Sequence, residues 1–183
     1  MADQNHLILT AVGPDQIGLV EKIAEFITRH GCNIEDSKMA VFCGEFALII
    51  LTSGKSGNLH RIASHHRELE IETGLAIAIK TPTSRKPAES FLPYTLTASC
   101  MDHPGIVYLL TGILSGFNIN IESMETKTYA APVSGTPIFR LEAELSVPTK
   151  TNLNALRERF AVVQREENID IELALARSPS SSA

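Results

Sequence analysis

The chain has 183 residues, of which 44% are hydrophobic and 20% are charged, and its formal net charge is −5. This composition is typical of a soluble globular protein, and the length suits one domain or two small ones. The negative net charge disfavours a protein whose own surface binds nucleic-acid phosphates, because such surfaces carry a basic patch.

Membrane and disulfide chemistry are also disfavoured by the sequence. No apolar run approaches the ~20 residues that span a bilayer, and the first six residues, Met-Ala-Asp-Gln-Asn-His, lack the basic start of a signal peptide. We therefore expect a cytoplasmic protein. The three cysteines, Cys32, Cys43 and Cys100, form no Cys-x-x-Cys pair. They are predicted to be buried or half-buried free thiols in a reducing compartment.

The hydrophobic pattern of residues 1–81 predicts six elements in the order β-α-β-β-α-β. The first helix has an apolar stripe between Ile17 and Ile27 at helical spacing, and Gly31 follows it as a left-handed cap. The predicted elements are a strand over 6–12, a helix over 16–30, strands over 33–43 and 45–52, a helix over 58–70 and a strand over 73–80.

The second half of the chain repeats this order after a break. Residues 82–92 contain two prolines and no periodicity, which predicts a linker. Apolar and polar residues alternate from Ile138 to Val147, which is typical of a sheet with one covered face. The tail at 178–183 is predicted to be disordered. The predicted elements are strands over 94–100 and 118–129, a helix over 105–115 between them, a strand over 138–147, a helix containing Leu153 to Val163, and a strand over 169–175.

One short motif occurs twice and organises both halves. A strand ends in Asp15-Gln16-Ile17-Gly18 in the first half and in Asp102-His103-Pro104-Gly105 in the second, 87 positions later. Each copy is followed by a Gly-x-Asn-Ile segment, at 31–34 and 116–119. Such self-similarity is typical of a duplicated domain.

The repeated element order predicts an α+β fold with two ferredoxin-like sandwiches in tandem. Each sandwich has an antiparallel four-stranded sheet with both helices on one face. The predicted domains cover 1–81 and 93–177, on either side of the 82–92 linker. The uncovered face of each sheet, or its edges, is then free to pair with the other domain or with another chain.

Asp15 and Asp102 stand just before the first helix of their domains, which gives them two interpretations. Each carboxylate could cap its helix by accepting from a backbone N–H at Gly18 or Gly105. Alternatively, the free N–H groups of the helix bind the carboxylate of a ligand while the aspartate binds its ammonium group. A glycine at the fourth position lets such a ligand approach the backbone. The second interpretation suits a small zwitterion such as an amino acid.

Asn33 and Asn118 open the second predicted strand of each domain. Each is a turn residue that tolerates unusual dihedrals, or an amide that contacts the ligand from one side, across an interface.

The remaining polar residues give little support for catalysis. His60, His65 and His66 lack the i, i+4 spacing of a helical metal site, and only His103 lies inside an Asp-x-x-Gly turn. No Gly-x-Ser-x-Gly, Walker or His-Glu-x-x-His motif occurs. We therefore expect no catalytic residues, no metal and no cofactor.

The strand, the Asp-x-x-Gly helix start, the Gly-x-Asn-Ile segment and the element order together resemble the ACT domain, a small-molecule-sensing regulatory module. Two such modules would fill nearly the whole chain. Within this family, the segments 31–37 and 134–139 resemble tandem-ACT repressors of transcription.

The resemblance implies ligand sites in which the first loop of one domain faces the second strand of another. Carried over by position, the first site has residues from both elements of the N-terminal domain, and the second has the matching residues of the C-terminal domain. The first comprises Asp15, Gln16, Ile17, Gly18, Asn33 and Ile34. The second comprises Asp102, His103, Gly105, Asn118 and Ile119. His103-Pro104 replaces Gln16-Ile17, so the resemblance leaves open whether the two sites share a ligand.

The resemblance also implies regulation rather than enzymatic activity. It suggests a small amino acid, glycine in particular, as the ligand, and a DNA-binding activator protein as the partner, with no direct contact to nucleic acid or membrane. A homodimer is expected. An alternative is a scaffold module that binds no ligand and regulates a metabolic enzyme by dimerisation.

Overall fold

The computed structural model describes residues 5–83 and 90–176, and the chain divides into two compact units, residues 1–85 and 86–183. We call them unit 1 and unit 2. The predicted tail at 178–183 and residues 84–89 of the predicted linker lie outside the described residues. At the other end of that linker, Phe91 and Leu92 already belong to the first strand of unit 2.

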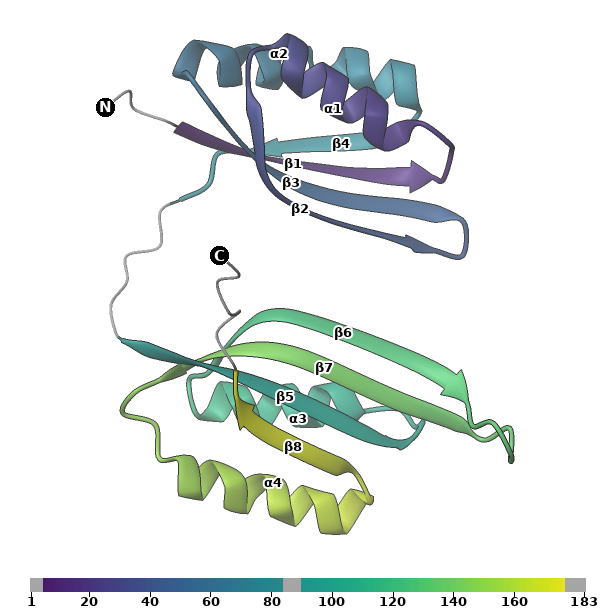
Figure 1. Cartoon of the computed structure of the whole chain (residues 1–183), viewed down its shortest axis with the longest axis vertical. Coiled ribbons are helices and arrows are strands. Elements are labelled where there is room, and N and C mark those ends of the chain that lie inside the picture. Colours follow the sequence, from purple (N-terminus) through teal and green to yellow (C-terminus); the bar gives the residue numbers. More distant parts are fainter. Residues whose placement is uncertain (1–4, 84–89, 177–183) are drawn as a thin grey trace, which may run out of the picture. The chain divides into compact units, whose positions relative to one another are not determined.

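Unit 1 has the element order β-α-β-β-α-β that its hydrophobic pattern predicts. Its strands form one antiparallel sheet in the order β2-β3-β1-β4, and both helices lie on the same side of that sheet (Figure 1). The elements are β1 (Asn5–Pro14), α1 (Leu19–Arg29), β2 (Asn33–Phe42), β3 (Glu45–Gly54), α2 (Ser56–Thr73) and β4 (Ala76–Lys80).

Unit 2 repeats this architecture, with a sheet in the order β6-β7-β5-β8 and its two helices on one side (Figure 1). The prediction of two ferredoxin-like α+β units is therefore confirmed. The elements are β5 (Phe91–Met101), α3 (Ile106–Gly116), β6 (Asn120–Ala130), β7 (Pro137–Pro148), α4 (Leu153–Glu167) and β8 (Asp170–Leu175).

Each core lies between the sheet and its helices. Alternate residues of a strand point to opposite faces, so the buried residues of β1 and β5 mark the face that the helices cover. Leu9 in β1 and Leu96 in β5 have no exposed surface, and the helix residues Ile23 and Leu110 that pack in the same two cores are equally buried. Burial of this apolar surface drives the folding of each unit.

The strand registers establish which residues of the two units occupy matching places. Leu9 pairs with Ile50 across β1 and β3, and Leu96 pairs with Ala143 across β5 and β7. Positions in β1, α1 and β2 therefore match positions in β5, α3 and β6 that come 87 residues later. Matching positions are 93 apart between β3 and β7, because residues 131–136 form a longer connection than the Cys43-Gly44 turn. This correspondence allows the two units to be compared residue by residue.

Candidate ligand site

The turn between the first strand and the first helix has the same geometry in both units. In unit 1 the backbone N–H of Asp15 donates to the carbonyl of Gly44, at 2.8 Å, and in unit 2 that of Asp102 donates to Pro137, at 2.9 Å. Gly18 and Gly105 then adopt left-handed conformations, with φ of 90° and 100°. Residues with a side chain rarely adopt these dihedrals, so both turns depend on glycine.

The structure corrects the helix starts and excludes one interpretation of the two aspartates. Gly18 and Gly105 are the N-caps, and neither α1 nor α3 has a side-chain cap. Asp15 and Asp102 therefore do not cap their helices. The left-handed glycine delays α1 until Leu19, three residues after the predicted start. An α-helix leaves its first N–H groups without partners inside the helix, and these groups attract anions.

The side chains of the two turns differ in exposure and chemistry. Asp15, Gln16 and Asp102 are exposed. Ile17 is exposed to 105% of its reference surface, so none of the described residues of unit 1 covers this apolar side chain. In the second turn His103 is half-buried, and its Nδ1 lies 3.1 Å from the carbonyl oxygen of Pro104. The first turn therefore presents a free apolar group where the second has a proline.

Asn33 opens β2 in a small polar cluster. Its Nδ2 donates to Oε1 of Glu35 at 3.5 Å, and the same carboxylate accepts a hydrogen bond from the Ser53 hydroxyl. These two hydrogen bonds, that of Ser53 first, lower the pKa of Glu35. Ile34 beside them is 36% exposed. The cluster thus combines an amide, a carboxylate and an accessible apolar side chain.

Within unit 1, the two parts of the predicted site do not meet. Asn33 pairs with Ser53, which pairs with His6 near the start of β1, whereas the Asp15 turn follows the end of β1 at Pro14. Eight residues of strand at about 3.3 Å each separate the two ends by roughly 26 Å. A ligand that touches both parts must therefore lie between the turn of one domain and the second strand of a different domain.

In unit 2 the structure corrects the match between Asn118 and Asn33 that the Gly-x-Asn-Ile sequence predicted. Asn118 lies in the turn before β6 with φ of 55°, and Ile119 is buried in the core. The backbone N–H groups of Asn118 and Ile119 donate to residues 115 and 114, as those of Gly31 and Cys32 donate to residues 28 and 27. Asn118 therefore matches the left-handed Gly31, and not Asn33.

The residue that matches Asn33 is Asn120, which is not among the residues predicted from the Gly-x-Asn-Ile segment. Asn120 opens β6 and pairs with Ser146, as Asn33 pairs with Ser53, and both strands have an irregularity after the next isoleucine. Its Nδ2 donates to Oε1 of Glu122 at 2.6 Å. The signal that would have found Asn120 and Ile121 is the offset of 87 positions, kept constant through the first helix.

The three cysteines are free, and their exposure differs from that predicted for one of them. Cys100 is buried and Cys32 is half-buried, but Cys43 is exposed, because it lies in the two-residue turn between β2 and β3. Burial raises the pKa of both Cys32 and Cys100. The charge of Asp102 raises that of Cys100 further, whereas the charge of Arg61 partly offsets the shift at Cys32.

A hollow of about 710 Å³ in unit 1 lies apart from the predicted site. It is bordered by His6 at the start of β1, by His60 on α2 and by Pro82 after β4, and none of the predicted site residues lines it. Within residues 5–83 and 90–176, no group of three His, Cys, Asp or Glu side chains is placed to hold a metal ion. In the same ranges, no helix is both long and apolar enough to cross a membrane.

Comparison with protein families gives a match over unit 1. Residues 5–80 match the model of the ACT domain, a range that runs from the start of β1 to the end of β4. Unit 2 has the same strand order and the same left-handed glycine turn.

Similar proteins extend over both units. The chain is 25% identical over 168 residues to the glycine cleavage system transcriptional repressor of Escherichia coli, covering 92% of this chain and 88% of that protein. A crystal structure of a protein of unknown function from Galdieria sulphuraria has a TM-score of 0.81 and 26% identity, covering 96% of this chain and all of the other. A crystal structure described as a candidate glycine cleavage system transcriptional repressor has a TM-score of 0.70 and 24% identity, covering 96% and 99%, and shows the shared fold.

Proposed function

We propose, from the premise that this chain carries an ACT domain at residues 5–80 and resembles the glycine cleavage system transcriptional repressor, that it is an amino-acid-responsive regulator of transcription. The observation that carries the proposal is the turn at Asp15 and its copy at Asp102. Each turn places an exposed carboxylate beside a helix whose N-terminus has no side-chain cap.

An amino acid suits this arrangement chemically. Its carboxylate can accept hydrogen bonds from the free N–H groups at the start of α1, and its ammonium group can pair with Asp15. Asn33 and Ile34 of another domain would close the site from the other side, because those of unit 1 lie at the far end of the sheet. Small ligands such as glycine fit best where Ile17 and Ile34 restrict the space. In unit 2 the corresponding groups are Asp102, Asn120 and Ile121.

The proposed output of this site is a change in binding to a protein. A DNA-binding activator is the proposed partner. The net charge of −5 opposes direct binding to the phosphate backbone. We therefore propose that the chain regulates transcription without contacting DNA, and that it has no catalytic role.

The ligand hypothesis is tested by thermal melts of the dialysed full chain with each of the twenty amino acids at millimolar concentration. A ligand at 100 times its dissociation constant adds about 2.7 kcal/mol, which raises the midpoint by roughly 5–10 °C. We expect glycine or a similarly small amino acid to give this shift. The variant Asp15→Asn should lose most of the shift that comes from unit 1, while Glu25→Gln on the exposed side of α1 should keep it.

A second candidate function is a scaffold that dimerises without a ligand and regulates a metabolic enzyme. The exposed apolar side chains on the open face of the unit 1 sheet favour it, because they suit association. If none of the twenty amino acids shifts the melt, or if Asp15→Asn and Glu25→Gln respond alike, the ligand hypothesis is wrong and the scaffold function gains support.

A further inference from the structure

The sheet of unit 1 has an apolar side that its helices do not cover. Residues of β1, β3 and β4 that alternate with the buried ones point away from α1 and α2. Val12 and Ile49 on this side are 52% and 46% exposed. We call this surface the apolar face, and it comprises Ile8, Val12, Ala47, Ile49, Leu51 and Ala78.

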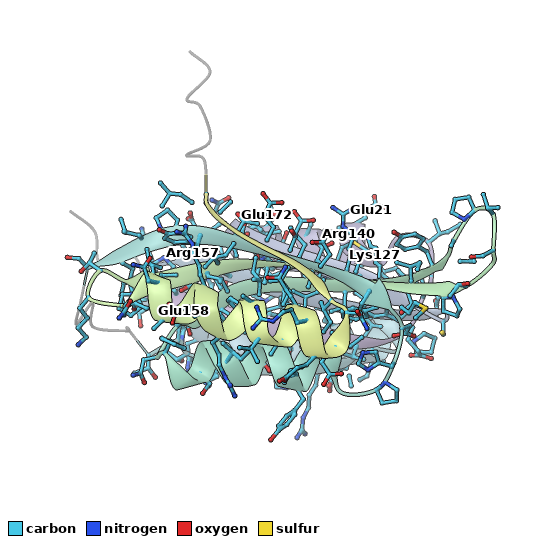
Figure 2. All side chains as sticks on the ribbon, turned by 90° about the horizontal axis from the view of Figure 1, so that it is seen from below. Glu21, Lys127, Arg140, Arg157, Glu158 and Glu172 are labelled. Carbon is cyan, nitrogen blue, oxygen red and sulfur yellow. The ribbon has the colours of Figure 1, made fainter. Side chains whose placement is uncertain are left out.

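Unit 2 carries polar and charged side chains at the six matching positions. We call this surface the polar face, and Figure 2 labels Arg140 and Glu172 on it, with Lys127 beside them on β6. Arg140 lies 4.0 Å from Glu142 in an exposed ion pair. In the order used for the apolar face, the matching residues are Thr95, Ser99, Arg140, Glu142, Glu144 and Glu172.

The apolar face has the composition and the size of an interface. Thr10 lies between Ile8 and Val12 on this side of β1, and its hydroxyl already donates to the carbonyl of Ala78 in the same sheet, so this donor keeps a partner when the face is covered. Charged side chains near it lie on the two edge strands, Asp36 and Lys38 on β2 and Lys80 on β4, and would form a polar rim. The whole open side of the sheet, with the rim strand β2 included, offers roughly 500 Å². Two such sides together bury roughly 1,000 Å², which reaches the lower limit of a specific interface.

Charge decides which surface fits against this face. Packing the polar face against it would remove Arg140, Glu142, Glu144 and Glu172 from water against apolar side chains, with opposite charges only at the rim, which is strongly unfavourable. A second apolar face brings no such cost, and identical faces can pair about a two-fold axis. We propose that the apolar face of unit 1 is a homodimer interface, on which the same face of a second copy of the chain packs.

The proposal is tested by sedimentation equilibrium of the full chain at about 10 μM without any amino acid. The wild type is expected to have the mass of two chains of 19.9 kDa. Ile49→Glu introduces the residue that unit 2 carries at the matching position 142, so the fold accepts it. Each dimer then places two carboxylates in the interface, and each has only Lys38 of the rim strand beside it. We therefore expect the dissociation constant to rise by about 100-fold.

The matched control is Glu142→Lys, a larger charge change on the polar face, which should leave the mass at two chains. Should Ile49→Glu fail to fold by circular dichroism, Val12→Ser, which copies Ser99, is expected to weaken the dimer by about tenfold. If the wild type stays monomeric at 100 μM, the proposal is wrong, and this holds also where unit 2 of the same chain covers the face. A dimer that both face variants leave unchanged, as edge pairing through β2 predicts, would also overturn the proposal. Neither result bears on the amino-acid site, because this test contains no ligand.

Discussion

The two sheets of this chain share their strand order and registers, yet their open faces have opposite chemistry. On the open faces, Ile49 and Ala47 of unit 1 match Glu142 and Arg140 of unit 2. On the helix-facing side, the matching residues Leu9 and Leu96 are both fully buried leucines. The fold therefore depends on the covered set of alternating residues and tolerates almost any chemistry on the other set. A duplicated domain can keep its architecture in this way while its two copies acquire different partners.

The largest effects are expected from the covered set, and they show whether the units unfold separately. Leu9→Ala and Leu96→Ala remove matching side chains that have no exposed surface, so each should destabilise its own unit by about 2–5 kcal/mol. All three tyrosines, Tyr94, Tyr108 and Tyr129, belong to unit 2. Urea unfolding followed by tyrosine fluorescence therefore reports unit 2 alone, while far-ultraviolet circular dichroism reports both units.

We expect Leu96→Ala to shift the fluorescence transition to lower urea concentration. Leu9→Ala should leave the fluorescence transition in place, while the first part of the dichroism change should occur at lower urea concentration. If Leu9→Ala shifts both signals together, the two units unfold as one cooperative body, and the comparison between independent copies is wrong.

The glycine turns should give the next largest effect. Gly105 has φ of 100°, and a Cβ added there meets no atom within 4 Å, so Gly105→Ala adds backbone strain without a clash. We expect a loss of about 1–2 kcal/mol. Gly112, inside the α3 helix that follows Gly105, also has open space around it but lacks a positive φ. Gly112→Ala should stabilise unit 2 by about 0.5–1 kcal/mol. Equal effects of the two substitutions on the urea midpoint would contradict the strain at the turn.

Gly18→Ala should repeat the result of Gly105→Ala in unit 1, where φ is 90° and the space is also open. Dichroism, and not tyrosine fluorescence, should record this loss.

The fold could be predicted from the sequence because the hydrophobic periodicity and the Asp-x-x-Gly motif indicate the same element order in both halves. Alternation from Ile138 to Val147 fixed the covered face of β7, and the repeated Asp-x-x-Gly motif located both turns. Helix starts were harder to predict. A glycine three residues after an aspartate fits both a capped helix and a left-handed turn, and only the dihedral of Gly18 distinguishes them.

Two physical reasons limit what the sequence can predict of the candidate site. Asn118 shares the Gly-x-Asn-Ile text of Asn33 but takes the place of Gly31, because asparagine also tolerates a left-handed conformation. The local sequence, Gly-x-Asn-Ile, therefore favoured Asn118 over Asn120 as the match of Asn33. Moreover, a sequence pattern gives no distance between the Asp15 turn and Asn33, which the strand registers place at opposite ends of the sheet.

A smaller effect is expected where the two units use different residues for the same turn. Asn118→Gly should change stability by less than about 0.5 kcal/mol, because both residues accept φ of 55°. The reverse substitution, Gly31→Asn, should cost about 1 kcal/mol. A Cβ at Gly31 would lie 2.8 Å from Nδ2 of Asn58, which donates to the Gly31 carbonyl, so the substitution breaks this hydrogen bond. Urea midpoints of both variants test the asymmetry, and equal costs would contradict it.

The smallest effect concerns the buried thiol next to the second turn. Burial, and then the charge of Asp102, raise the pKa of Cys100 in the folded protein. In the unfolded chain this thiol titrates near about 8.5, so it loses its proton first from the unfolded state. Its contribution to the free energy of unfolding is therefore fully present below that pH and is lost as the pH rises through the folded pKa.

Urea unfolding between pH 7 and 10, followed by circular dichroism, should show a decline that is shallower in Cys100→Ala than in the wild type. Asp102→Asn should lower the pKa of Cys100 and reduce the decline part of the way. Cys43→Ala provides the control, because its side chain is exposed in a turn and its removal should leave the slope unchanged. If Cys100→Ala declines as steeply as the wild type, the thiol does not contribute, and the half-buried Cys32 of unit 1, whose pKa burial also raises, becomes the group to substitute.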